Sequence, residues 1–182
     1  KHHKESDGQP LDMIHREESK LNAFDLYFGD INSRPLDAAF NYKKYNKGND
    51  TVLEFWKELD MTMGSGVRIP VEIRKKYLFK PDEYVVELEV QLTNKAGKAV
   101  QFNYNGFAYS LGFGPQIGPN YEKLDGKYDF RKYITFNGEK KKEVKLPKPD
   151  TKEVDARTSW SAISGKYFAV IGITDATQYK TV

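Results

Sequence analysis

The sequence predicts an all-β protein, an antiparallel β-supersandwich in which two large sheets pack face to face with little helix. Apolar and polar residues alternate along most of the apolar stretches, and this period of two is typical of strands with one buried face. Aromatic residues make up 14% of the 182 residues, and their flat rings pack well on a pleated sheet. Apolar sheet faces must be buried against another layer, so two packed sheets are expected.

The first elements are a possible helix and a strand. The stretch 34–45, RPLDAAFNYKKY, is the best candidate for a helix, because Pro35 stands near its first turn, where proline is well tolerated. The segment 51–60, TVLEFWKELD, alternates apolar residues with Glu54 and Glu58, which predicts a half-buried strand. Its apolar positions are Leu53, Phe55 and Leu59.

The middle of the chain predicts an antiparallel meander of three strands. The first strand begins at Val67 and ends at Phe79. Pro70 within it predicts an edge or bulge position, because proline cannot donate a hydrogen bond to the ladder. The following turn, strand, chain reversal and strand are expected at 80–83, 86–92, 94–98 and 100–109.

The second half of the chain adds a hairpin and a last strand. Residues 129–136 are predicted to pair with 143–146 across NGEKKK, 137–142, because Asn137-Gly138 within it is a strong hairpin signal. The apolar segment 166–174 is predicted as the final strand, and Trp160 before it as an aromatic plug at one end of the sandwich.

The uncharged stretch 111–119, LGFGPQIGP, is predicted to be a wide turn between strands. Gly112, Gly114 and Gly118 tolerate positive φ, and proline fixes the exits of the turn. A phosphate-binding loop is excluded, because no lysine stands in the required position and no apolar helix face follows Pro119.

Composition excludes several classes of function. The 29 Lys and Arg against 26 Asp and Glu give a formal net charge of +3, too small and too evenly spread to predict nucleic-acid binding. The chain has no cysteine, and its three histidines lie at or before His15, so no imidazole is available downstream for a triad or a zinc site. Glu87 and Glu89 share a strand face, which a solvated surface explains better than a glycosidase site. No catalytic, cofactor-binding or metal-binding residue is predicted.

Membrane and leader segments are not predicted either. The uncharged run 99–121 has the length of a membrane span, but Pro115 and Pro119 would break the required helix. The opening stretch KHHKESDGQP is polar throughout and has no leader pattern. We expect a single soluble domain over 1–182.

Three motifs in order resemble a known family. The segment TSWSAISGKYFAV, 158–170, is similar to the W-x-[AG]-[IM]-x-x-[KR]-Y-F segment in the extracytoplasmic domain of YidC-type membrane protein insertases. A meander like KKYLFKPDEYVVELEVQLTN, 75–94, precedes that segment in the family, and FGPQIG, 113–118, resembles the family turn W-G-P-G-[IL]-G, with Phe113 and Gln116 in place of Trp and Gly. The signature residues carried over from these motifs are Gly114, Pro115, Gly118, Trp160, Tyr167 and Phe168.

The resemblance implies a non-catalytic β-supersandwich domain excised from a larger protein. In the family, this domain lies between the first two transmembrane helices, on the periplasmic face of the bacterial inner membrane. The implied partners are Sec translocon components and nascent membrane proteins, and no cofactor is implied. A carbohydrate-binding or mutarotase-like module is the alternative, because related sandwiches include such proteins.

A partner surface is predicted in the aromatic and basic segment 120–136, because Tyr, Phe and Arg are enriched at the cores of interfaces. The residues proposed for partner binding are Tyr121, Tyr128, Phe130, Arg131 and Tyr133.

Overall fold

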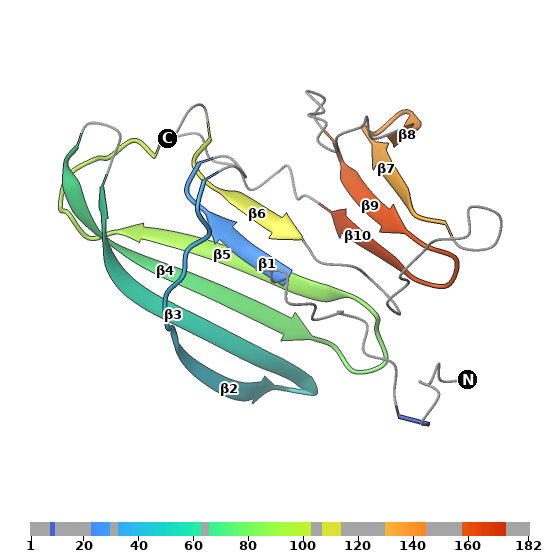
Figure 1. Cartoon of the computed structure of the whole chain (residues 1–182). Coiled ribbons are helices and arrows are strands. Elements are labelled where there is room, and N and C mark those ends of the chain that lie inside the picture. The colour runs from blue at the N-terminus through green and yellow to red at the C-terminus, as the bar shows by residue number, and fades with distance from the viewer. Residues whose placement is uncertain are drawn as a thin grey trace. The chain divides into compact units, whose positions relative to one another are not determined.

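The computed structural model describes residues 8–9, 23–29, 33–62, 66–102, 107–113, 130–144 and 158–173. This part of the chain contains strands and no helix, and the registered strand pairs are all antiparallel (Figure 1). The predicted all-β class is therefore confirmed. The strands are β1 (Ala23–Tyr27), β2 (Asn41–Lys47), β3 (Asp50–Thr62), β4 (Arg68–Phe79), β5 (Val86–Asn94), β6 (Ser110–Phe113), β7 (Lys132–Phe136), β8 (Lys141–Val144), β9 (Trp160–Ser164) and β10 (Ala169–Ile173).

The chain divides into two compact units, Phe24–Phe113 and Lys1–Ala23 with Gly114–Val182. In the Phe24–Phe113 unit, a four-stranded sheet has the order β2-β3-β4-β5, and β1 pairs with β6 in a two-stranded sheet. In the other unit, a four-stranded sheet has the order β10-β9-β7-β8. That the whole chain is one domain stays a prediction.

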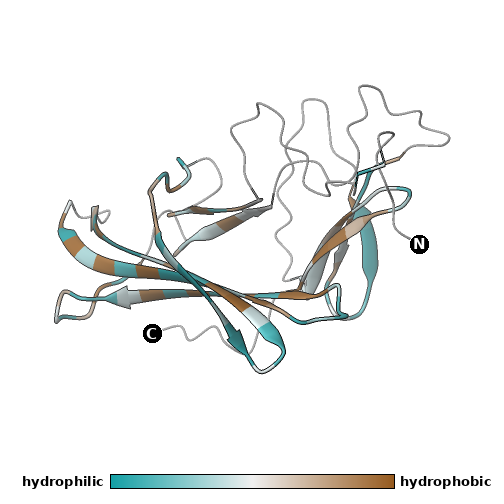
Figure 2. Cartoon of the chain, turned by 90° about the horizontal axis from the view of Figure 1, so that it is seen from below, coloured by the Kyte–Doolittle hydropathy of each residue, from teal (hydrophilic) through white to brown (hydrophobic). Residues whose placement is uncertain are grey.

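The core of the Phe24–Phe113 unit lies between its two sheets. Alternation along β3 and β4, visible as alternating colours in Figure 2, places Met61 opposite Ile69 on one sheet face. Leu26 of β1 is buried in the same cluster as these residues, together with Val71 and Ile73. The two-layer packing that the apolar faces predict is therefore present within this unit.

Lys75 ties β1 to the four-stranded sheet from the edge of this core. Its Nζ donates a hydrogen bond of 2.7 Å to the backbone oxygen of Phe24. The Phe24 ring meets the Tyr77 ring edge-on, with centroids 5.8 Å apart. Burial lowers the pKa of the Lys75 ammonium, and the nearby Asp25 carboxylate opposes this effect.

The helix predicted over 34–45 is wrong. Residues 36–40 have no regular structure, and β2 begins at Asn41. Gly48, with φ of 63°, makes the two-residue turn that folds β2 back onto β3. Leu36 and Phe40 pack against the core from this irregular stretch, whereas all seven side chains of β2 are exposed, so the apolar residues that suggest a helix stop before residue 41.

The edge strand predicted from Pro70 is wrong, because β4 is an interior strand, but Pro70 itself lies just beyond the last residue of β4 that pairs with β5. The oxygen of Pro70 accepts a hydrogen bond of 2.9 Å from the N–H of Lys95, on the β5 side. The nitrogen and oxygen of one strand residue point to the same side in an antiparallel ladder. The nitrogen of Pro70 therefore points to the β5 side, where the pairing of β4 with β5 has ended. Its lack of an N–H group costs no hydrogen bond to β3, and the pairing of β4 with β3 continues through Pro70.

The third strand of the predicted meander is misplaced. The chain does reverse after β5, where the Asn94 side chain accepts a hydrogen bond from the N–H of Ala96 and donates one to the oxygen of Lys98. Residues 95–102 then form no strand, and β6 begins at Ser110 and pairs with β1 instead of β5. Val100 and Phe102 still pack against the core, so their apolar pattern reflects burial without strand pairing.

The wide turn predicted over 111–119 is wrong for residues 111–113, which belong to β6. Gly112 lies within β6, where a Cβ atom would stand 2.8 Å from the buried ring of Tyr27. Residues 114–119 lie outside the described residues. Glycine is required at 112 for close approach of the backbone to a ring, and positive φ has no part in it.

We predict that Gly112→Ala lowers the free energy of unfolding by about 1–3 kcal/mol, because the Tyr27 ring is buried and must shift to admit a methyl group. Urea unfolding measures this effect. Gly172→Ala is the matched control, since its Cβ would meet only the Ser161 oxygen at 3.8 Å. Equal stability of the two variants would contradict the argument.

The sheet of the second unit contains a hairpin at Asn137-Gly138 as predicted, but its second strand is β8, Lys141–Val144, two residues earlier than expected, and the connection is residues 137–140. Gly138 has φ of 99°, and the Asn137 side-chain oxygen accepts hydrogen bonds from the N–H groups of Glu139 and Lys140. One edge of β7 pairs with β8 and its other edge pairs with β9. The final predicted strand is shorter than expected, since β10 spans Ala169–Ile173.

Candidate functional site

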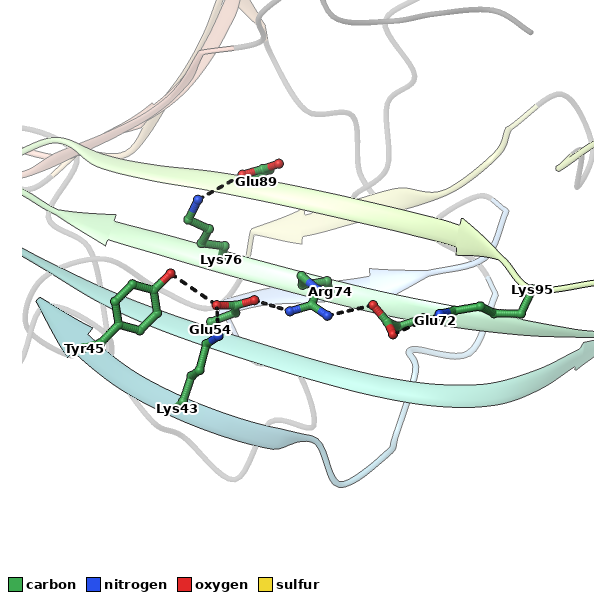
Figure 3. Close-up of polar contacts among 8 residues, drawn as sticks. All are labelled: Lys43, Tyr45, Glu54, Glu72, Arg74, Lys76, Glu89 and Lys95. Atoms are coloured by element: carbon green, nitrogen blue, oxygen red, sulfur yellow. Dashed lines mark hydrogen bonds and ion pairs between the residues drawn. The ribbon is translucent and has the colours of Figure 1, made fainter. Parts of the chain in front are cut away.

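The outward face of the four-stranded sheet in the Phe24–Phe113 unit carries a connected set of charged side chains (Figure 3). Strand register sets opposite charges beside one another, because Lys43 pairs with Glu54, Glu54 with Lys76, and Lys76 with Glu89 across β2 to β5. Alternation puts all four side chains on the face opposite the core. We call this surface the charged face.

Glu54 is the centre of the charged face. Its residue is only 6% exposed, yet three groups approach its carboxylate. Lys43 Nζ lies 3.0 Å from Oε2, the Tyr45 hydroxyl donates to Oε2 at 3.2 Å, and an Arg74 Nη1 group donates to Oε1. Each carboxylate oxygen therefore has a cationic partner, as a buried charge requires.

Hydrogen bonds from Lys43 and Arg74 lower the pKa of the Glu54 carboxyl from its ordinary value to about 2, against the opposing effect of burial. The carboxylate stays ionised at neutral pH and cannot act there as a general acid. Its chemistry is that of a fixed anion holding two cations on neighbouring strands.

Arg74 extends the network along the sheet. Its Nη2 group donates to Glu72 Oε1 at 2.8 Å, and Lys95 Nζ lies 3.6 Å from Glu72 Oε2. The hydrogen bond from Arg74 is the main cause that lowers the pKa of the Glu72 carboxyl. The Trp56 ring lies beside both cations of the network, 6.0 Å from the Arg74 guanidinium and 5.9 Å from Lys43 Nζ.

A polar depression of about 390 Å³ opens on the charged face. Its lining residues are Tyr45, Glu54, Glu72, Arg74, Lys76, Glu89 and Gln91. The charged groups of this lining are already engaged with one another, including Lys76 with Glu89 at 3.6 Å. Within the described residues, no group of three His, Asp or Glu side chains is arranged to hold a metal ion. The geometry fits a structural charge network better than a reactive site.

The predicted partner-binding residues are only partly placed. Tyr121 and Tyr128 lie outside the described residues. Phe130 is 38% exposed, and Lys132 Nζ stands 5.6 Å from the centre of its ring. Arg131 and Tyr133 are half-buried. Tyr133 lies on β7, where it pairs with Val144 of β8 and with Ile163 of β9. That these residues bind a partner stays a prediction.

The signature residues that the structure describes all lie on the hairpin of β9 and β10. Trp160 begins β9 and stacks on Phe136 of β7, with ring centroids 5.4 Å apart. Tyr167 and Phe168 lie in the turn between β9 and β10, which the Gly165 N–H closes by a hydrogen bond of 2.8 Å to the Phe168 oxygen. Gly114, Pro115 and Gly118 lie outside the described residues.

Sequence analysis missed the charged face. Alternation assigns Glu54 to the polar side of its strand, but its two ion-pair partners, Lys43 and Arg74, come from two other strands. The signal available in the sequence is the Gly48-Asn49 turn, which fixes the register of β2 on β3. Once that register is known, Lys43 falls opposite Glu54.

No helix in the described part of the chain has the length and hydropathy of a membrane span.

Comparison with known proteins gives a consistent result. A family model described as the YidC periplasmic domain matches residues 1–182. The chain is 31% identical over 163 residues to a membrane protein insertase YidC of Treponema denticola, which covers 88% of this chain and 28% of that protein. A protein of the same name from Treponema pallidum is 27% identical over 190 residues, covering 88% of this chain and 30% of that protein. No solved structure matches.

The chain thus spans less than a third of the length of either relative. These findings favour the insertase hypothesis over the carbohydrate-binding alternative. With the match extending over residues 1–182, the chain belongs to the YidC periplasmic domain family.

Proposed function

We propose that this chain is a non-catalytic, periplasm-facing domain of a multi-pass inner-membrane insertase, which assists insertion and folding of inner-membrane proteins alone or with the Sec translocon. The observation that carries this proposal is the family match over residues 1–182. The names of the two relatives, both membrane protein insertases, support it. The engaged ion pairs of the charged face also support a scaffold that performs no bond-making.

Within this role, Phe130 and Arg131 form part of the surface that contacts a partner. An exposed aromatic ring beside an arginine is a common composition of interface hot spots. A photo-crosslinking residue at position 130 of the full-length protein, followed by mass spectrometry, tests the role directly. Crosslinks to Sec components or to nascent membrane proteins are expected, and crosslinks to neither would overturn the proposed function.

We predict that Phe130→Ala with Arg131→Ala reduces co-purification of Sec components with the full-length protein by about tenfold, the effect of losing one hot spot. Tyr167→Ala is the matched control, because Tyr167 is also an exposed ring with a lysine over it, Lys166 Nζ at 4.9 Å. Unchanged recovery with the double variant would reject this partner surface while leaving the crosslinking result to decide the function.

A further inference from the structure

The outer edge of β2 is open. β2 is an edge strand of the sheet β2-β3-β4-β5, and no described strand pairs with its outer side. All seven of its residues are exposed, Tyr42 by 69%. An edge strand of this length presents a row of backbone donors and acceptors to which an extended polypeptide can add as a further strand.

The turn after β2 shows which backbone groups face outward. Lys47 and Asp50 flank the two-residue turn, so the Lys47 carbonyl points toward the Asp50 N–H, on the β3 side. Backbone groups alternate between the two sides of a strand. The N–H and C=O groups of Tyr42, Lys44 and Asn46 therefore point away from β3.

The charge of β2 restricts what can add there. The strand contains Lys43, Lys44 and Lys47 and no carboxylate. Lys43 is held by Glu54 on the charged face. Within the described residues, neither Lys44 nor Lys47 has an ion-pair partner. Lysines on an edge discourage pairing with neutral or basic strands, and the same charges favour an acidic one.

We propose that β2 is a docking strand for an extended, acidic polypeptide segment of another protein, which pairs with the outward backbone groups of Tyr42, Lys44 and Asn46. Lys44 and Lys47 would then face carboxylates of the added strand. The inference stands apart from the proposed function, since it identifies the partner only by its chemistry.

A second copy of this chain fits the edge less well. Antiparallel pairing of β2 with another β2 about its centre would set Lys44 directly opposite Lys44, and like charges placed so are destabilising. The other edge of the sheet, β5, offers Glu87 and Glu89, but these already pair with Lys80 at 2.5 Å and Lys76 at 3.6 Å. An anionic membrane would attract the lysine side chains, but it would offer no backbone carbonyl groups to accept hydrogen bonds from the outward N–H groups.

The test uses the full 182-residue chain and an acetylated, amidated heptapeptide of sequence Thr-Glu-Glu-Thr-Glu-Glu-Thr, which carries glutamates on both strand faces because Lys44 and Lys47 lie on opposite faces of β2. NMR titration and amide hydrogen exchange are measured at residues 42, 44 and 46. We expect submillimolar binding and exchange slowed by about tenfold or more at these three amides, because added strand pairing protects them. Binding without this protection would overturn the proposal.

Three variants separate backbone pairing from charge. Lys44→Pro removes one outward N–H group without touching the β3 ladder, and its affinity should fall about tenfold. Lys44→Gln keeps that N–H and should lose only about threefold. Lys44→Glu with Lys47→Glu leaves the backbone intact and should lose more than about tenfold.

Circular dichroism confirms that each variant folds. Equal affinity of wild type and the Lys44→Glu, Lys47→Glu variant would overturn the proposal, whatever the fate of the proline variant. Binding to phosphatidylglycerol vesicles without binding to the peptide would also overturn it, in favour of a membrane contact. Self-association through β2, seen by sedimentation and lost in the same double variant, would overturn it in favour of a second copy.

Discussion

Ile73→Ala is expected to lower the free energy of unfolding by about 3–4 kcal/mol, a large part of the stability of a domain of this size. Ile73 is fully buried in β4 and packs in the cluster that joins the four-stranded sheet to Leu26 of β1. Truncation removes apolar contacts and leaves a cavity that neighbouring β strands cannot close, because each is held by its own ladder. Urea unfolding followed by tryptophan fluorescence measures the loss.

Two further substitutions calibrate this result. Ile73→Val removes one methyl group and should cost about 1 kcal/mol. Val86→Ala, on β5 of the same sheet, should cost less than about 1 kcal/mol because Val86 is 44% exposed. Similar losses for Ile73→Ala and Val86→Ala would show that the core does not lie between the two sheets.

The long strands of the four-stranded sheet could be predicted because their signal is local. β3, β4 and β5 each alternate apolar and polar residues, and this period of two needs no knowledge of the partner strand. β2 and β9 were harder. β2 has no buried side chain, so no apolar period marks it. In β9 only Ala162 is buried, and the strand is short.

The pairing of strands and the ion pairs of side chains could not be predicted, because they join residues that are far apart in the sequence. The pairing of β6 with β1 joins segments from opposite ends of their unit. The same holds for the charged face, where Glu54 reads as an ordinary outward residue of β3 until Lys43 and Arg74 are brought beside it. The motif resemblance identified the family, but it predicted neither of these contacts between distant residues.

Glu54→Gln is expected to lower the free energy of unfolding by about 2–3 kcal/mol at pH 7, because it leaves Lys43 and Arg74 facing one another without their shared anion. The pKa of this carboxyl is about 2 in the folded protein and about 4.3 when unfolded. Because the folded pKa is the lower one, the stabilisation is fully present above about pH 4.3 and is lost as pH falls toward 2.

The difference in stability between wild type and Glu54→Gln should therefore be constant from pH 7 to about 5 and then shrink below it. Urea unfolding at a series of pH values measures this. Glu89→Gln is the matched control from the same cross-strand row, because Glu89 is 64% exposed and its pair with Lys76 spans 3.6 Å. It should change stability by less than about 0.5 kcal/mol. A loss in Glu54→Gln that is equally large at pH 2.5 would show that the amide disturbs packing and that the charge of Glu54 is not what stabilises the sheet.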